Sequence, residues 1–339
     1  MNNQVDFVIT WVDNNDPDWK KEKEKYANAL GINTSNAKCD TNEIRYRDMD
    51  CLKYWFRAVE KYAHWVHKIF FVTYGHIPNW LNTDCPKLQI VNHRDFIPKK
   101  YLPTFNSNAI EALMHKIPNL SESFVYFNDD MFLTDYTKKE DFFKNGIPCD
   151  SCSLRAISII KGNNDSFYKK VCNDIEIINS YFDFQKWKKD NFLKIVNPKI
   201  GKYLLFSIPC MIYNDFPGFN TYHLPISYSK SIFNEVWNKE EGILKTTMSY
   251  KFRNNTDSVN HWLFEYWQFA KGQFVQRSIG FGKSFTIDDK KLDEAIIKKK
   301  YKTICINDSI KLDNFEVRKK EIAAAFEKVL PNKSSFESN

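Results

Sequence analysis

The segment YFNDDMFL, residues 126–133, begins as an apolar run typical of a buried strand and continues directly into an amide and two adjacent carboxylates. Ligands of open α/β sheets sit beyond the carboxyl ends of the strands, which is where Asn128, Asp129 and Asp130 fall. Two acids there can ligate a divalent cation that neutralises a diphosphate, or one can hold the metal while the other accepts a proton. The alternative is a turn in which Asn128 and Asp129 cap backbone groups.

Strand-like and helix-like patterns alternate around this segment. Short β-branched and aromatic runs predict strands, and apolar residues at helical spacing predict helices, the first of them with Asp48 as its N-cap. Such alternation implies right-handed crossovers, so we expect an α/β fold with a mainly parallel, Rossmann-like (GT-A-like) sheet flanked by helices. The predicted strands are 5–12, 68–74, 88–91 and 124–127, and the predicted helices of this half are 48–63 and 106–117, with a further helix start at Pro17.

The second half of the chain has less regular alternation and more lysine, asparagine and aromatic residues. We expect residues 1–150 to form the α/β half, 151–217 a helical insertion, 218–330 the remainder of the catalytic domain and 331–339 a loosely held tail. Helices are predicted at 165–180 and 183–195 within the insertion, and at 229–237 and 258–271 after it.

Size and charge limit the classes of function. A chain of 339 residues with 43% apolar content can bury a sizeable core. No apolar run reaches the ~18 residues that a membrane span needs, and the N-terminus does not have the pattern of a signal peptide, so we expect a cytoplasmic protein. The net charge of +7 suits an anionic substrate or the inner face of an acidic membrane, but also fits an ordinary solvated surface. The basic run KKKYK, residues 298–302, is expected on a solvent face.

Three further motifs carry candidate site residues. FNSN, residues 105–108, places Asn106 and Asn108 at a helix start, where free N–H groups favour phosphate, although N-capping explains either one alone. His223 in TYHLP lies on an extended loop and could exchange a proton, whereas a loop histidine without a role is the more frequent case. Arg253 in YKFRNNTD could make a forked contact with phosphate or a surface ion pair, and Arg47 is ambiguous in the same way.

The order of these motifs resembles the Stealth family of sugar-phosphate transferases, which includes bacterial capsular polysaccharide phosphotransferases. The matching blocks cover well over half the chain in family order, and the stretch 152–217 matches none of them. The blocks are DFVITWVDNNDP at 6–17, then RYRDMDCLKYWFRAVEKYAHWV, GHIPNWLN, LPTFNSNAIE, YFNDDMFL and EDFF between 45 and 143, then FNTYHLPIS at 219–227 with YKFRNNTD at 250–257, and finally TICINDS at 303–309 with LPNKSSFE at 330–337.

The resemblance implies transfer of hexose-1-phosphate from a nucleotide-diphosphate sugar, usually UDP-linked, to an acceptor hydroxyl, which yields a phosphodiester and a nucleoside monophosphate. It makes residues 1–150 the nucleotide-sugar-binding half. The expected acceptor is a glycan or lipid-linked glycan of the cell surface, with peripheral membrane association as a further option and no nucleic acid as partner. The expected site has catalytic His223, Arg253, Asp130 and Asp129, substrate-binding Asp13, Arg47, Asn106, Asn108, Asn128 and Asn307, and Mg²⁺ or Mn²⁺ held by Asp130, Asp129 and Asp308.

The chain departs from the family pattern at one position, and two other functions remain as alternatives. Where many family members carry an arginine in the second block, this chain has Lys53, which keeps the charge but not the planar two-pronged contact. A metal-dependent glycosyltransferase would use the same acidic pair but release the nucleoside diphosphate. A non-catalytic module for anionic polymers is the weaker rival, because the basic residues do not form one aromatic-interleaved stripe.

Overall fold

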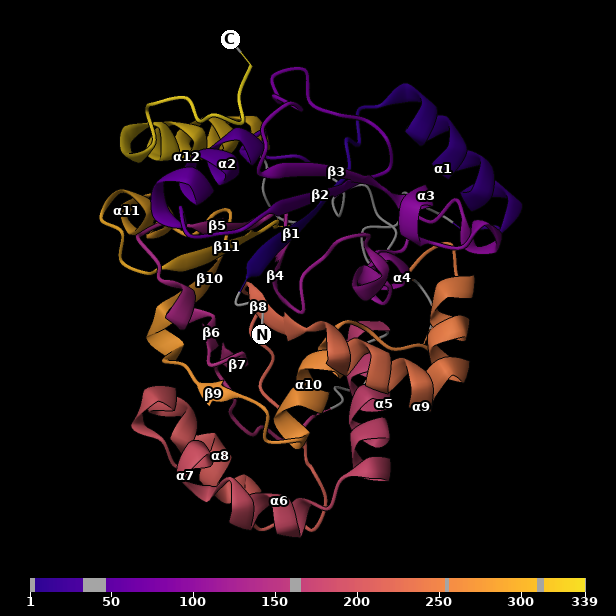
Figure 1. Ribbon diagram of the computed structural model, residues 1–339, viewed down its shortest axis with the longest axis vertical. Helices are drawn as coiled ribbons and strands as arrows, with labels where there is room; N and C mark the ends of the chain where they lie inside the picture. The colour runs from indigo at the N-terminus through magenta and orange to yellow at the C-terminus, as the bar shows by residue number, and fades with distance from the viewer. Residues whose placement is uncertain (1–3, 33–46, 159–165, 254–255, 310–313, 339) are drawn as a thin grey trace.

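The computed structural model describes residues 4–32, 47–158, 166–253, 256–309 and 314–338. Its centre is a five-stranded sheet in the order β3-β2-β1-β4-β8, in which every pair is parallel except β4 with β8 (Figure 1). The α/β fold with a mainly parallel sheet flanked by helices is therefore confirmed, and the four predicted strands agree to within one residue at either end. The strands are β1 (Val5–Trp11), β2 (Ile69–Thr73), β3 (Leu88–Asn92), β4 (Ser123–Asn128) and β8 (Ile226–Ser229).

Successive residues of the strands face two separate cores, because side chains alternate across a sheet. In β1, Phe7 and Ile9 join one core and Val8 joins the other, and all three are fully buried. Helices close both cores, and burial of each such large side chain stabilises the fold by about 1.5–3 kcal/mol. The first core contains residues of α2 (Leu52–Tyr62), α11 (Leu292–Ile297) and α12 (Phe315–Val329), and the second contains residues of α5 (Ser166–Tyr181), α9 (Lys230–Ser249) and α10 (Trp262–Ala270), as Figure 1 shows.

A second sheet brings the end of the chain to the acidic segment. β11 (Thr303–Asn307) lies between β10 (Gly282–Thr286), to which it is parallel, and β5 (Met131–Leu133), to which it is antiparallel. One further bond extends this pairing, since the Ile306 N–H donates to the Asp130 carbonyl at 2.9 Å. A third sheet consists of β6 (Phe143–Lys144), β7 (Ile147–Asp150) and β9 (Val275–Gln276).

The remaining helices include those of the predicted insertion. α1 (Pro17–Ala29) starts at Pro17 as expected, and Asp16 is its N-cap. Asp183 likewise caps α6 by accepting from the N–H groups of Gln185 and Lys186. Among the described residues no helix is both long and apolar enough to cross a bilayer. The insertion carries α5, α6 (Phe184–Asp190), α7 (Phe192–Ile195), a 3₁₀ stretch Pro198–Tyr203 and α8 (Leu204–Cys210), whereas its boundaries as a domain stay a prediction.

Two helix starts and several helix ends differ from the prediction. Asp48 does not cap α2, because its carboxylate accepts from the Trp11 indole at 3.1 Å and from the Asp50 N–H, and the residue before the helix is Cys51. α10 begins at Trp262 rather than near residue 258, and α9 continues to Ser249, well past the predicted end.

The helix predicted over 106–117 is shorter. It forms only α4 (Ser107–Glu111), preceded by α3 (His93–Phe96) and followed by a 3₁₀ turn at Met114–Lys116. The Trp237 indole donates to the Ala112 carbonyl at 2.8 Å, at the point where α4 ends. A contact from another part of the chain therefore accompanies the end of this helix, which local periodicity does not show.

The expectation of a loosely held C-terminal tail is wrong. Glu337 accepts two hydrogen bonds at 2.8 Å from the guanidinium of Arg57 on α2, and both side chains are buried. Phe336 packs in the core beside Phe56, with 5.3 Å between the ring centroids. The residues after α12 are therefore fixed in place by contacts with α2, through a buried ion pair and a buried aromatic contact.

Candidate active site

The ends of β1, β4 and β11 place most of the predicted site residues at one edge of the sheets. β1 and β4 are parallel neighbours with Thr10 opposite Asn128, so both chains leave the sheet on the same side. Asp13 follows β1 there, with its N–H donating to His76 Nε2 at 2.7 Å and its carboxylate accepting from the Asn15 N–H at 2.8 Å. Asp13 and Asn128 therefore lie at the ends of neighbouring parallel strands, on the same side of the sheet.

His223 is held between two asparagines from different sheets. Its Nδ1 lies 2.7 Å from Asn307 Oδ1, and its Nε2 lies 3.2 Å from Asn128 Nδ2. The Asn307 amide is oriented by its other end, because Nδ2 donates to the Phe285 carbonyl, which can only accept, and to Ser284 Oγ. This network assigns the proton to His223 Nδ1 and leaves the Nε2 lone pair to accept from Asn128.

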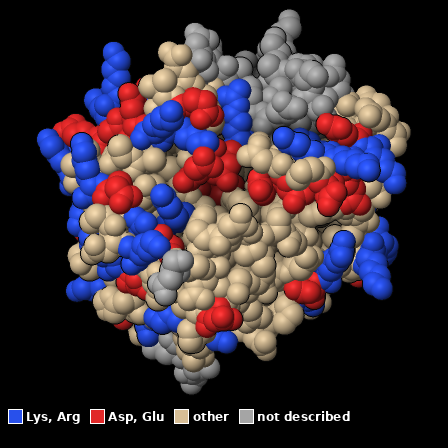
Figure 2. All heavy atoms as spheres, turned by 90° about the horizontal axis from the view of Figure 1, so that it is seen from above, with Lys and Arg blue, Asp and Glu red and all other residues tan. Residues whose placement is uncertain are grey.

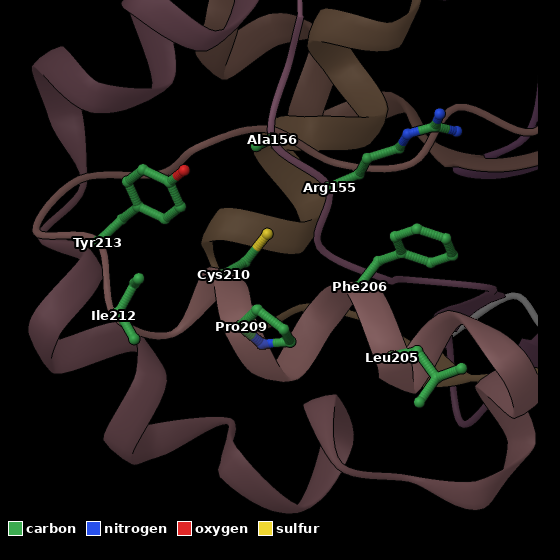
Figure 3. Close-up of a pocket in the computed structure, with 8 residues that line it drawn as sticks. All are labelled: Arg155, Ala156, Leu205, Phe206, Pro209, Cys210, Ile212 and Tyr213. Atoms are coloured by element: carbon green, nitrogen blue, oxygen red, sulfur yellow. The ribbon is translucent and has the colours of Figure 1, made fainter.

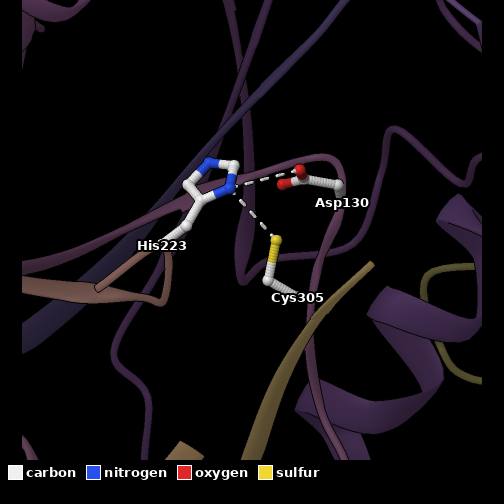
Figure 4. Close-up of side chains that lie close together, drawn as sticks. All are labelled: Asp130, His223 and Cys305. Atoms are coloured by element: carbon white, nitrogen blue, oxygen red, sulfur yellow. Dashed lines mark hydrogen bonds and ion pairs between the residues drawn. The ribbon is translucent and has the colours of Figure 1, made fainter. Parts of the chain in front are cut away.

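Asp130, His223 and Cys305 form a three-residue cluster (Figure 4). His223 Nδ1 lies 3.8 Å from Asp130 Oδ2 and 3.3 Å from Cys305 Sγ. Burial, and secondly the charge of Asp130, raises the pKa of the Cys305 thiol well above its usual value. Mg²⁺ and Mn²⁺ are hard cations that prefer oxygen to sulfur. The oxygen atoms of Asp130 are therefore the better donors for a hard cation.

The charge of the acidic pair is incompletely balanced. Although part of the Asp129 side chain is exposed, surrounding protein atoms hinder solvation of its carboxylate, and this burial, together with the charges of Asp130 and Asp48, raises its pKa to about 8. Asp130 Oδ1 is buried and accepts no hydrogen bond within the described part of the chain. Both observations fit a site that gains stability when a cation binds.

Asp308, the third predicted metal ligand, does not belong to the Asp130–His223–Cys305 cluster. Its Oδ1 accepts from the Ser309 N–H, and its Oδ2 lies 3.8 Å from Arg47 Nη1. Burial raises the pKa of Asp308, while that N–H and Arg47 oppose the rise. Its buried Oδ2 accepts no hydrogen bond from the described residues, so it can still turn to a cation. Arg47 itself stacks on Phe315 at 5.0 Å and lies beside the acidic group as a cation.

Arg253 reaches the same region from beyond α9. Its Nη1 donates to Ser107 Oγ at the start of α4 at 3.3 Å. Its positive charge is near enough to lower the pKa of both Glu111 and Asp129, although burial opposes the effect on each. A guanidinium therefore faces the acidic pair from the α4 side.

The two asparagines of the FNSN motif are buried. Asn106 caps α4 by accepting from the Asn108 N–H, and its Nδ2 donates to the carbonyls of Thr247 and Tyr250. These bonds tie α4 to the end of α9 and leave the fully buried Asn106 without access to a substrate. Asn108 is 8% exposed and lies in the first turn of α4. Asn106 therefore supports the structure around the site and does not line its open surface.

Comparisons with known proteins identify the family. The model for Stealth protein CR1, conserved region 1, matches residues 3–31, and the model for Stealth protein CR2, conserved region 2, matches residues 45–149. The capsular polysaccharide phosphotransferase WcwK of Streptococcus pneumoniae is 46% identical over 337 residues, which cover 98% of this chain and 98% of that protein. This chain belongs to the Stealth family.

Other proteins similar to this Stealth-family chain carry related names. The receptor polysaccharide phosphotransferase WefC of Streptococcus oralis is 38% identical over 342 residues, 99% of each chain. The exopolysaccharide phosphotransferase cps2G of Lactiplantibacillus plantarum is 37% identical over 336 residues, 98% of this chain and 96% of that one. Among solved structures, the galactosyltransferase LgtC with donor and acceptor sugar analogues aligns over 97% of this chain and 98% of its own, with a TM-score of 0.40 and 10% identity.

The candidate site also includes three buried residues that the sequence analysis did not single out. Glu111 accepts from Tyr126 Oη at 3.0 Å and lies 3.0 Å from His261 Nδ1, and the Tyr126 hydroxyl also contacts Asn128 Oδ1 closely. Burial alone would raise the pKa of Glu111, but His261 and Arg253 lower it below its usual value. A carboxylate inside the apolar run AIEALM was the available signal for Glu111, whereas His261 had none.

Proposed function

We propose that this chain transfers hexose-1-phosphate from a nucleotide-diphosphate sugar, with a UDP-sugar as the preferred donor, to a hydroxyl of a cell-surface glycan or lipid-linked glycan. The three relatives named above are polysaccharide phosphotransferases by name, and these names support the reaction class. The acceptor oxygen attacks the phosphorus that carries the sugar. The bond from this phosphorus to the bridging oxygen breaks, and that oxygen leaves with the bonding electrons on the nucleoside monophosphate.

One observation carries the mechanistic part of the proposal, namely that His223 has its Nδ1 proton fixed by Asn307 and its Nε2 lone pair directed toward Asn128. A histidine held in this tautomer can take the proton of an attacking hydroxyl at Nε2, as general bases do. The contact of 3.2 Å to Asn128 occupies Nε2 in the structure. We therefore assign Asn128 a substrate-binding role. When the acceptor binds, its hydroxyl takes the place of the Asn128 amide at His223 Nε2.

We assign stabilisation of the negative charge on the phosphoryl groups to Arg253 and to a cation held by the acidic residues. Phosphoryl transfer depends on positioning and on cations near the transferred group, and Arg253 supplies one such cation close to Asp129. Asp130 Oδ1 and Asp308 Oδ2 are buried and accept no hydrogen bond from the residues that the structure describes. Together with the crowded charge of Asp129, these oxygens fit Mg²⁺ or Mn²⁺. When bound, such an ion would neutralise the diphosphate. Asp13 and Arg47 remain the proposed contacts for the remaining parts of the donor.

The charge distribution supports a small anionic donor better than a nucleic acid. Figure 2 shows Lys and Arg interleaved with Asp and Glu over the face it presents, with no continuous basic field. The basic run at 298–302 is offset by acidic partners, because Lys298 and Lys300 both pair with Glu294. Nucleic-acid binding requires positive charge that is clustered on one surface, so we propose that no nucleic acid is a partner. We also propose that the chain works at the cytoplasmic face of the membrane.

The test is a panel of nucleotide sugars incubated with the protein, Mg²⁺ or Mn²⁺ and a glycan acceptor, with the released nucleotide identified by chromatography. The proposal expects UMP from a UDP-sugar, and less UMP when EDTA removes the cation. Release of UDP, with an acid-stable glycoside as the product, would assign the chain to the glycosyltransferases instead.

A further inference from the structure

Helices α7 and α8 of the insertion, with the residues directly after α8, expose a group of large apolar side chains, which we call the α7–α8 face. Its large side chains have exposed fractions from 49% to 82%, far above those of core residues. Apolar side chains grouped in this way mark an interaction site more often than scattered exposed leucines do. The α7–α8 face consists of Phe192, Leu193, Leu205, Phe206, Ile208 and Ile212, and its helices lie at the lower end of the molecule in Figure 1.

The orientation of α8 is fixed from its inner side. The Ser207 hydroxyl of LLFSIPC accepts from the Leu154 N–H at 2.9 Å and lies 3.3 Å from the Leu154 carbonyl. Ser207 and Cys210 are buried, so Leu205 and Ile208 of the same helix must face outward. Leu205, Phe206 and Ile212 line a pocket of about 330 Å³. Figure 3 shows these side chains. Arg155 lies at the edge of this pocket.

The surroundings of the α7–α8 face are basic. Residues 183–215 contain six lysines and three acidic residues, Asp183, Asp190 and Asp215. Lys186, Lys189, Lys199 and Lys202 are exposed. An apolar face with lysines around it is typical of helices that lie in the interface of a bilayer, where apolar side chains enter the acyl boundary and the lysines meet anionic headgroups.

Two other occupants fit less well. A second copy of the chain would bring two such lysine-rich segments together, and like charges oppose that contact. A glycan needs hydrogen-bonding groups, and aliphatic Leu193, Leu205 and Ile212 offer none. We propose that the α7–α8 face docks on the surface of an anionic lipid bilayer.

The α7–α8 face is also connected to the candidate active site. Tyr203, directly before α8, packs against Tyr222 with 5.4 Å between ring centroids, and Tyr222 precedes His223 in the chain. Tyr222 Oη in turn lies 2.9 Å from Ser153 Oγ, next to the residue that anchors α8. Docking on a bilayer would therefore hold His223 close to the membrane surface. The consequence that a lipid-linked acceptor is delivered to His223 rests on the proposed function, whereas docking itself does not.

The test is sedimentation of the full chain with vesicles of phosphatidylcholine alone and of phosphatidylcholine mixed with phosphatidylglycerol. The expected result is stronger binding to the mixed vesicles. Leu205→Ser combined with Ile212→Ser should weaken that binding about tenfold or more, because two apolar side chains no longer enter the bilayer. Lys186→Glu combined with Lys189→Glu should remove the preference for the anionic lipid.

Matched controls lie on other surfaces. Leu30→Ser with Val317→Ser changes side chains that are 56% and 55% exposed, and Lys20→Glu with Lys21→Glu repeats the charge change on α1. Both controls should bind vesicles as the unchanged chain does, and thermal unfolding checks that every variant is folded. Failure of the unchanged chain to bind mixed vesicles, or equal binding by Leu205→Ser/Ile212→Ser, would overturn the proposal. A dimer that this variant dissociates, without vesicle binding, would assign the face to a second copy.

The same variants separate docking from catalysis. Turnover of a nucleotide sugar with a water-soluble acceptor should be unchanged in Leu205→Ser/Ile212→Ser, since the substitutions lie outside the site. Turnover with a vesicle-embedded lipid-linked acceptor should fall. If UDP proves to be the released nucleotide, the proposed function fails while the vesicle result stands by itself.

Discussion

His223 Nδ1 lies 2.7 Å from Asn307 Oδ1, although the two residues are 84 positions apart in the chain. Asn307 ends β11, whose neighbour β5 directly follows the acidic pair, so the second sheet brings this amide to the histidine. The amide determines which imidazole nitrogen carries the proton. Asn307 is therefore a positioning residue for the general base that we propose.

Asn307→Leu should lower kcat about 10²-fold to 10³-fold with little change in KM, because the imidazole loses the partner that fixes its tautomer. Asn307→Asp keeps an acceptor at the same position and should retain much more activity, with the acidic limb of the kcat profile moved to higher pH because a carboxylate stabilises imidazolium. Steady-state kinetics across pH measure both effects. A raised KM with unchanged kcat in Asn307→Leu would make Asn307 a substrate contact instead.

Arg253→Ala should reduce kcat by about 10³-fold or more, by analogy with arginines that stabilise transferred phosphoryl groups. Arg253→Lys should recover only part of this loss, since a point charge replaces a planar fork. The matched control is Arg94→Ala, which removes an exposed guanidinium outside the site. Turnover of Arg253→Ala near that of the control would exclude Arg253 from the reaction.

Asp129→Asn should stabilise the protein near pH 7 in the presence of EDTA. The pKa of Asp129 is about 8 in the folded chain, mainly through burial, against an ordinary value of 3.8. Between these values the folded state keeps a proton that the unfolded state has lost, so the wild-type chain loses stability as pH rises from about 4 to about 8. Asparagine does not titrate, and the gain should therefore vanish near pH 4. Thermal unfolding of both proteins across this range measures the difference, and an equal melting temperature at every pH would contradict it.

Glu337→Gln should lower the free energy of unfolding by about 3 kcal/mol, because it removes the charge of the buried one of the two carboxylates that pair with the Arg57 guanidinium. The control is Glu327→Gln, whose side chain also pairs with Arg57 but is 48% exposed, and it should cost less than about 1 kcal/mol. Urea denaturation compares the two variants. Equal losses in both would show that the end of the chain does not hold α2 through this pair.

The parts of the fold that follow from local patterns were predictable. Strands that are buried on both faces of a parallel sheet appear in the sequence as short continuous apolar runs, such as Phe70-Phe71-Val72. Such runs are shorter than helices and richer in β-branched and aromatic residues. Tertiary contacts decided the rest. The end of α4 coincides with a bond from Trp237, and the C-terminal residues are ordered by Arg57 far earlier in the chain.

The candidate site shows the same division. Asp129 and Asp130 were recognisable because two acids after an apolar strand conflict with burial. His223 was a candidate from its extended loop that the family resemblance strengthened, and Asn307 was recognisable only through that resemblance. Their contact with each other depends on the pairing of β11 with β5, which local sequence does not encode. Asn106 was assigned to the substrate because a helix start favours anions, but its side chain is used in capping α4 and holding α9.

The most direct test of phosphoryl transfer uses a UDP-sugar labelled with ³²P in the phosphate that is attached to the sugar. Incubation with the protein, Mn²⁺ and a glycan acceptor should move the label into the glycan product, with unlabelled UMP released, and His223→Gln should suppress this transfer. Label that remains in UDP while unlabelled sugar reaches the glycan would contradict the account.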